Sequence, residues 1–429
     1  MLCLTSVAAV CQFVPQPLNY PGPGYWPAYF SIIDSNHVWV GTIHESGLAF
    51  PFSAKTSDGG NTWKFDSIPV PGTPFCSSIC GWDTNTCYFV FVDADTLGGM
   101  IWKTTDGGNN WNNMTTSQFA GGFANFYHAF SADTGVAMGD PTGGYFEIQI
   151  TNNGGASWTR VPSANIPSPL ANEAGWNDGY SYAGNSVWFS TNQGRCFRST
   201  NKGLNWQVTD VVPGGNGMFD VCFSGDQKGV YWMQDAVTNA VAVTSDGGIN
   251  WDTVSFPQGY SIMMMSAVPG FNGGFILTAF KNGTHVFFTP DLFSNLIEIE
   301  SNIVSSGEIS FSNAWTGWLA AGESGTNEIY RYTGILTKAE DIHKEKHPLL
   351  IIPNPSGTKA LVRISAGPEL AEVGLRIFDK TGKLCYNGNL RSSGGWITLD
   401  ASSFPAGIYE LVVSSGNEVM GAGRWIVSH

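Results

Sequence analysis

Short apolar stretches, separated by turns rich in Gly, Asn and Asp, fill most of the first 335 residues. Cys87–Val92 and Ser186–Phe189 are two of them, and both are rich in the β-branched and aromatic residues that favour strands. Each such stretch lies roughly 15 to 20 residues before a recurring turn, and another apolar stretch comes directly before that turn. The pattern predicts repeated units of four short strands in an all-β protein.

The recurring turn has a fixed pattern: Ser or Thr, any residue, Asp or Asn, any residue, Gly, two residues, then Trp. Its Asp or Asn positions are spaced by 48, 47, 48 and 45 residues. The Asp or Asn side chain can accept hydrogen bonds from backbone N–H groups, Gly supplies a positive φ, and Trp buries a large ring. We therefore predict a structural rather than a catalytic role for the five pairs Asp58 and Trp63, Asp106 and Trp111, Asn153 and Trp158, Asn201 and Trp206, and Asp246 and Trp251.

Two weaker units follow the five clear ones, at Gly274–Asp291 and Thr316–Tyr332. Together they predict a seven-bladed β-propeller, with six or eight blades as the alternatives. The segment Tyr29–Ile33 is expected to supply a strand that closes the ring. The predicted fold class is all-β, with the propeller followed by a small β-sandwich.

The chain is predicted to have four parts. Residues 1–16 are interpreted as a signal peptide that lacks its basic start, with a first β-strand as the alternative. Residues 17–335 form the propeller, 336–348 a charged linker, and 349–429 a β-sandwich. No apolar run is long enough for a transmembrane span.

The turn motif resembles the Asp-box, or BNR, motif of sialidases, sortilin-type receptors, xyloglucan hydrolases and the photosystem II assembly-factor family. The last of these is the most similar, with seven blades and units of this length. Sialidase activity is not expected, because it needs three inward arginines from different blades. The propeller has only Arg160, Arg195, Arg198 and Arg331, and Arg160 follows an Asp box. Xyloglucan hydrolases use paired propellers, whereas this chain has one.

Three residues are candidates for catalysis. Asp140 lies in a turn-rich segment, Glu173 lies in a long irregular stretch, and His128 could join them across a blade boundary. Paired carboxylates can serve hydrolysis or hold a cation, and ordinary turn capping is the alternative.

Aromatic residues in loop-like segments are candidates for ligand binding. Trp176, Tyr180 and Tyr182 could stack on sugars or dock a peptide, and packing between blades is the alternative.

Composition and charge exclude several classes of partner. The chain has 53 Gly and 16 Trp, and only 13% of its residues are charged, which is typical of all-β repeat proteins. Residues 17–335 contain 25 acidic and 10 basic residues, so binding to nucleic acid is not expected.

No Cys or His spacing suggests a metal site, and no cofactor is predicted. Cys80 and Cys87 could form a cross-strand disulfide, with buried thiols as the alternative.

The C-terminal strands carry a second resemblance. Pro353–Pro355, Phe378–Gly382, Phe404–Tyr409 and Arg424–Val427 are similar in order and spacing to the C-terminal sorting domain of the type IX secretion system of Bacteroidetes-like bacteria. This resemblance implies that residues 349–429 engage the outer-membrane secretion machinery. It also implies that the protein reaches the cell surface or the medium.

The sequence thus predicts an exported, monomeric propeller that binds glycan or protein or acts as a scaffold. The alternative is a carbohydrate-active hydrolase that uses paired carboxylates on the propeller face, a glycoside hydrolase rather than a sialidase. An enzyme is the less favoured reading, because the fold alone gives no site.

Overall fold

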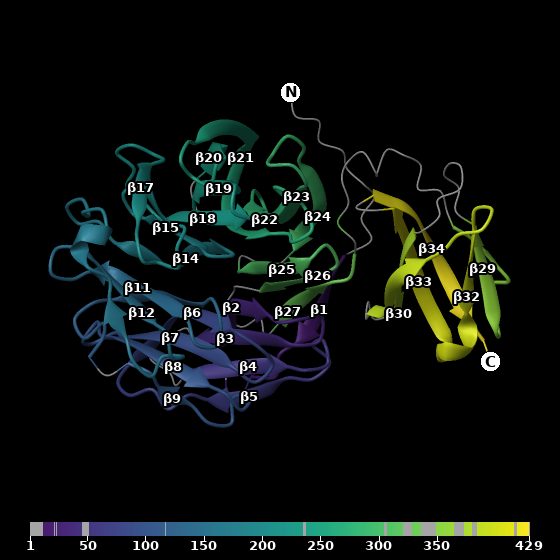
Figure 1. The fold of residues 1–429 in the computed structure, drawn as a ribbon, viewed down its shortest axis with the longest axis horizontal. Helices are drawn as coiled ribbons and strands as arrows, with labels where there is room; N and C mark the ends of the chain where they lie inside the picture. Colours follow the sequence, from purple (N-terminus) through teal and green to yellow (C-terminus); the bar gives the residue numbers. More distant parts are fainter. Residues whose placement is uncertain are drawn as a thin grey trace. The chain divides into compact units, whose positions relative to one another are not determined.

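The computed structural model describes residues 12–428 except 21, 23, 45–50, 116, 235–236, 304–306, 321–327, 335, 337–348, 364–372, 380–383 and 416–417. The chain divides into two compact units, Met1–Gly334 and Ile335–His429. The first unit contains seven antiparallel four-stranded blades, and the second contains two facing sheets (Figure 1).

The first four blades are separate sheets whose strands follow the chain order. They consist of β2 (Tyr25–Ile32), β3 (Val38–His44), β4 (Phe52–Thr56) and β5 (Lys64–Ser67); β6 (Pro74–Gly81), β7 (Cys87–Asp93), β8 (Gly99–Thr104) and β9 (Asn112–Asn113); β10 (Ala124–Ala129), β11 (Gly135–Pro141), β12 (Phe146–Thr151) and β13 (Thr159–Arg160); and β14 (Gly175–Ala183), β15 (Ser186–Thr191), β16 (Arg195–Ser199) and β17 (Gln207–Asp210). A short 3₁₀ segment, η1 (Ser163–Asn165), precedes the fourth blade.

The fifth and sixth blades share one long strand. They contain β18 (Phe219–Ser224), β19 (Lys228–Met233), β20 (Val237–Thr244), β21 (Asp252–Ala267), β22 (Phe275–Phe280), β23 (Thr284–Thr289) and β24 (Ile297–Ile303). The first part of β21 pairs with β20, and its second part pairs with β22. Because Ser261 pairs with both Val237 and Phe280, β21 ends one blade and begins the next.

The seventh blade joins the two ends of the propeller. It contains β25 (Ile309–Asn313), β26 (Thr316–Ala320), β27 (Glu328–Tyr332) and, as its outer strand, β1 (Phe13–Pro17). Phe13 pairs with Tyr332 and is fully buried, with their ring centroids 5.2 Å apart. The N-terminal strand therefore closes the ring.

This closure corrects two sequence-based expectations. Tyr29–Ile33 does not close the ring, because residues 25–32 form β2, the innermost strand of the first blade. The propeller also begins before residue 17, because the last residues of the predicted signal peptide lie in β1. The signal-peptide interpretation of residues 1–16 stays a prediction, and residues 1–11 lie outside the described residues.

The Asp boxes have the predicted hydrogen bonds and occupy equivalent places. In the first box, Asp58 Oδ1 accepts from Thr62 N at 2.9 Å, and Thr56 Oγ1 accepts from Gly60 N at 2.8 Å. Gly60 has φ +91°, and a Cβ there would lie 2.5 Å from the ring of Trp318 in the seventh blade. Each box tryptophan directly precedes the fourth strand of its blade.

The sixth blade contains a box that lacks both Gly and Trp. Asp291 accepts hydrogen bonds from the backbone and side chain of Asn295, as the box aspartates do elsewhere. Leu292 and Phe293 have φ values of +55° and +65°, in the region that usually favours glycine. The turn thus keeps its backbone conformation although the sequence motif is incomplete. This explains why the sequence shows only a weak repeat at this blade.

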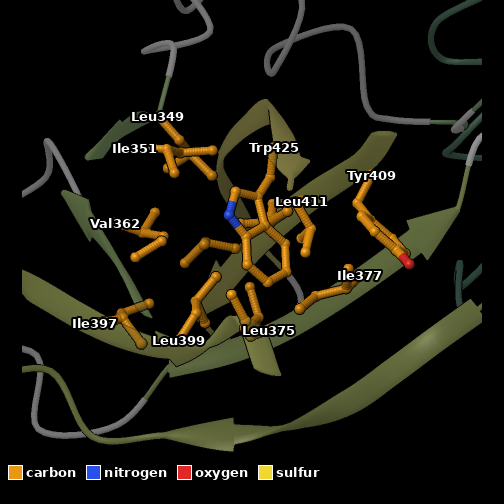
Figure 2. Close-up of a cluster of buried hydrophobic side chains, with 14 of the residues drawn as sticks. Leu349, Ile351, Val362, Leu375, Ile377, Ile397, Leu399, Tyr409, Leu411 and Trp425 are labelled. Atoms are coloured by element: carbon orange, nitrogen blue, oxygen red, sulfur yellow. The ribbon is translucent and has the colours of Figure 1, made fainter. Parts of the chain in front are cut away.

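The second unit is a β-sandwich. One sheet contains β28 (Leu350–Ile352), β29 (Lys359–Arg363) and β32 (Trp396–Asp400), and the other contains β30 (Val373–Asp379), β31 (Leu384–Leu390), β33 (Gly407–Ser415) and β34 (Glu418–Val427), with η2 at Ala401–Ser403. Figure 2 shows Trp425 among aliphatic side chains from both sheets. Asn354 bonds the backbone of Arg424 and Ile426, which ties the Pro353–Pro355 segment to the last strand.

Candidate functional site

A cavity of about 1280 Å³ lies at the centre of the propeller. Residues on or beside the first strand of every blade line it: β2, β6, β10, β14, β18, the second part of β21, and β25. These strands contact one another in turn, and β25 contacts β2, so they form a closed ring around the cavity. A pocket of this size is large enough for a small ligand or several side chains of a larger one.

The predicted aromatic residues lie together at this cavity. Trp176, Tyr180 and Tyr182 line it from β14, and His128 lines it from the neighbouring β10. The rings of His128 and Tyr182 stack with centroids 3.9 Å apart, and Tyr180 stacks on Phe126 at 4.2 Å. Tyr182 remains 55% exposed. Tyr180 therefore packs between blades, and Tyr182 presents a free face for a ligand.

His128 does not have the properties of a general acid or base at neutral pH. Burial lowers its pKa to about 3, so its imidazole is neutral over the physiological range. Its Nδ1 atom has no hydrogen-bond partner among the described residues. His128 can therefore act in this cavity as a neutral hydrogen-bonding group.

Asp140 serves as a connection between two blades. Its Oδ1 accepts from Asn125 Nδ2 in the third blade and from Gly175 N in the fourth, both at 2.9 Å. Burial raises the pKa of its carboxyl. Asp140 is not among the residues that line the central cavity.

Glu173 also bonds within the protein. Its Oε1 accepts from Arg195 Nε at 2.9 Å and from Thr191 Oγ1 at 2.7 Å, while Oε2 accepts from Leu170 N at 2.8 Å. Like Asp140, it does not line the cavity. The contacts of both carboxyls match the structural alternative, and a catalytic role for Asp140, Glu173 and His128 stays a prediction without support from this geometry.

Three carboxyl groups that were not predicted from the sequence line the cavity: Asp178, Asp220 and Glu308. They come from the fourth, fifth and seventh blades. Asp178 lies in an irregular part of β14, between the Gly175 and Tyr180 pairs, and has φ +53°. This irregularity breaks the two-residue alternation of strands, so the sequence pattern does not show that Asp178 points inward. The sequence does offer one indication, which is that Asp178 lies between Trp176 and Tyr180, two residues predicted to bind a ligand.

Neutral groups hold these carboxyls. Asp178 accepts from Ser78 Oγ at 2.7 Å, Asp220 accepts from Gln234 Nε2 at 2.9 Å, and Glu308 accepts from Phe30 N at 2.9 Å. Burial raises the pKa of Asp178 to about 8 and that of Asp220 to about 7. Burial, followed by the nearby charge of Asp178, raises the pKa of Glu308.

These shifts predict how stability depends on pH. A carboxyl whose pKa is raised in the folded state lowers the free energy of unfolding as pH rises from about 4 to about 8. The reason is that the same carboxyl ionises at a lower pH in the unfolded chain. The box residue Asp246, whose pKa is lowered to about 2 by hydrogen bonds from Asn250, has the opposite effect below about pH 4. Thermal unfolding should therefore show the highest Tm near pH 4–5.

A variant isolates the contribution of Asp178. Asp178→Asn is expected to raise Tm at pH 8 by about 2–6 °C and to leave it nearly unchanged at pH 5. Differential scanning calorimetry across this range measures both values. An equal effect at the two pH values would show that ionisation of Asp178 is not involved.

Cys80 and Cys87, the two cysteines considered for a disulfide, are buried free thiols. Cys80 pairs with Tyr88 and Cys87 pairs with Gly81, and both cysteines are free and buried. The predicted bridge is therefore wrong, and the alternative of buried thiols holds. No three His, Cys, Asp or Glu side chains in the described part of the chain are grouped so that they could hold a metal ion.

Four-stranded blades with Asp-box turns, arranged around a central cavity, define an Asp-box β-propeller. In this protein a β-sandwich follows the propeller in the sequence. Residues 350–428 match the family described as the secretion system C-terminal sorting domain. The protein is therefore exported through the type IX secretion system to the cell surface or the extracellular space. None of the described helices is long and apolar enough to cross a membrane.

The propeller is similar to solved structures of YCF48, a photosystem II assembly factor. The structure titled YCF48 bound to D1 peptide is 14% identical with a TM-score of 0.57, and the match covers 76% of this chain and 98% of that one. YCF48 from Cyanidioschyzon merolae is 13% identical with a TM-score of 0.54, and the match covers 74% and 98%. At this identity the likeness shows the fold alone. No curated protein matches the sequence significantly.

Proposed function

We propose that this exported propeller is a recognition module that binds an extracellular glycan or protein in its central cavity. The cavity of about 1280 Å³, lined by all seven blades, is the observation that carries the proposal. Rigid strands position its aromatic rings, and a few polar groups among them can orient a ligand. The sorting domain delivers this site to the outside of the cell.

Aromatic residues at the cavity favour a ligand with flat apolar faces. Trp82 and Tyr182 line the cavity and are 40% and 55% exposed, although large aromatic side chains usually bury most of their area. Exposed rings of this kind stack on sugar rings or pack against peptide side chains. The same rings therefore serve either class of ligand.

Glycan and peptide arrays probed with the full-length protein test this proposal. We expect saturable binding to a restricted set of ligands, and we expect the double variant Trp82→Ala/Tyr182→Ala to bind about tenfold or more weakly. Leu204→Ala is the matched control, because Leu204 is similarly exposed on an Asp-box turn away from the cavity. Equal binding by the cavity variant would contradict a central site, and shortening of arrayed oligosaccharides would indicate hydrolysis instead.

A further inference from the structure

The central cavity contains three carboxyls and no basic counterpart. No Lys or Arg is among its lining residues, and its single His is neutral. The ion pairs found in the described residues, such as Arg195 with Glu173, lie elsewhere. Asp178, Asp220 and Glu308 thus face one space without a cation that could balance them.

Some acceptor atoms in this cavity have no partner among the described residues. Asp178 uses only Oδ1 and Glu308 uses only Oε2 in hydrogen bonds. His128 provides a separate indication, because it is only 5% exposed, lines the same cavity and has an Nδ1 atom without a partner. The open oxygens of Asp178 and Glu308 belong to half-buried side chains that line the cavity, where a ligand can supply donors. A buried polar atom such as His128 Nδ1 is almost always hydrogen-bonded, so its lack of a partner among the described residues also points to a ligand.

The arrangement favours an organic cation over a metal ion. The carboxyls are not grouped closely enough to hold a metal among the described residues. An ammonium or guanidinium group supplies several donors over a wider area and also attracts aromatic faces, which Tyr29, Trp176 and Tyr182 provide around this cavity.

We propose that the cavity binds a ligand bearing an alkylammonium or guanidinium group, and that Asp178, Asp220 and Glu308 hold this group. The inference rests on the proposed function, since it names the chemistry of the ligand that the central site takes. Two sources share this chemistry: a free polyamine, and the Lys or Arg side chain of a peptide.

Binding of such a cation should release protons. Burial raises the pKa of Asp178 to about 8 and that of Asp220 to about 7, so both carry bound protons near neutral pH, whereas a bound cation favours their charged forms. The other titratable groups around them stay neutral, because burial raises the pKa of Tyr29, Tyr180, Cys76, Cys80 and Cys222. Affinity should therefore increase from pH 6 to pH 8, with proton uptake by the buffer.

Isothermal titration calorimetry of the full-length protein tests the inference. The probes are spermidine, a peptide containing Lys, a peptide containing Arg, and a neutral counterpart of each, namely fully acetylated spermidine and the peptides with acetyl-lysine or citrulline in place of Lys or Arg. We expect at least one cationic probe to bind, tenfold or more tightly at pH 8 than at pH 6, and its neutral counterpart to lose binding. The probe that binds more tightly identifies the source of the cation.

Isosteric variants make the result decisive. Asp220→Asn and Glu308→Gln should each weaken binding about tenfold or more, whereas Asp226→Asn, on an exposed turn, should not change it. A cooperative melting transition at pH 5 with a Tm like that of the wild type shows that the variants fold. Binding that is insensitive to neutralising the cation or to these variants overturns the inference, as does the absence of binding by every cationic probe. If arrayed neutral ligands still bind the wild type in that case, the proposed central site stands and only its cation chemistry fails.

Discussion

Arg195→Met is expected to lower the free energy of unfolding by about 3–5 kcal/mol, because it leaves the carboxylate of Glu173 buried without its charged partner. The Glu173 side chain is 0% exposed and that of Arg195 is 9% exposed. Arg195 also donates to Ser168 O at 3.1 Å, so the pair fixes the long segment that leads into the fourth blade. Urea unfolding of the variant and the wild type measures the difference.

The double variant Arg195→Met/Glu173→Leu separates the ion pair from the space that it fills. An apolar pair of similar size often replaces a buried ion pair without loss, so this variant should regain most of the lost stability. If the double variant is as unstable as the sum of the two single variants, the two side chains do not act as a pair.

Trp206→Ala is expected to destabilise the propeller by about 3–5 kcal/mol, the usual cost of removing a large buried ring. Trp206 is 5% exposed, its Nε1 donates to Gly203 O at 2.8 Å, and its ring meets that of Phe189 at 5.1 Å. It belongs to a core that includes Phe126 and Met138 of the third blade as well as residues of its own blade. Its removal should therefore weaken the contact between the two blades.

Leu204→Ala is the matched control for this variant. Leu204 lies in the same Asp-box turn but is 52% exposed, so its truncation should change stability by less than about 0.5 kcal/mol. Chemical unfolding followed by tryptophan fluorescence measures both variants. A small effect of Trp206→Ala, equal to that of Leu204→Ala, would show that the box tryptophan does not hold neighbouring blades together.

The repeat could be predicted from the sequence because its chemistry is local. Asp58 and Thr56 accept hydrogen bonds from residues of the same turn, and the same spacing recurs where the same turn is needed. The comparisons confirm the propeller and the sorting domain. The closing strand has no such local signal, because Phe13 pairs with Tyr332 at the opposite end of the propeller sequence.

The candidate site could be predicted only in part. Trp176 and Tyr182 line the cavity, and the sequence points to them because aromatic residues in irregular segments are conspicuous, while their role in ligand binding stays a prediction. Asp140 and Glu173 were conspicuous for the same reason, but their partners Asn125 and Arg195 are distant in sequence. Which carboxyls face the centre depends on strand register and on the irregularity in β14, and a single sequence records neither.

A crystal structure of the full-length protein with its array-selected ligand tests the central claim most directly. We predict that the ligand lies inside the ring of first strands, within contact distance of Trp176 and Asp220. A ligand bound on the outer strands or on the blade edges, with the central cavity left to water, would contradict the account.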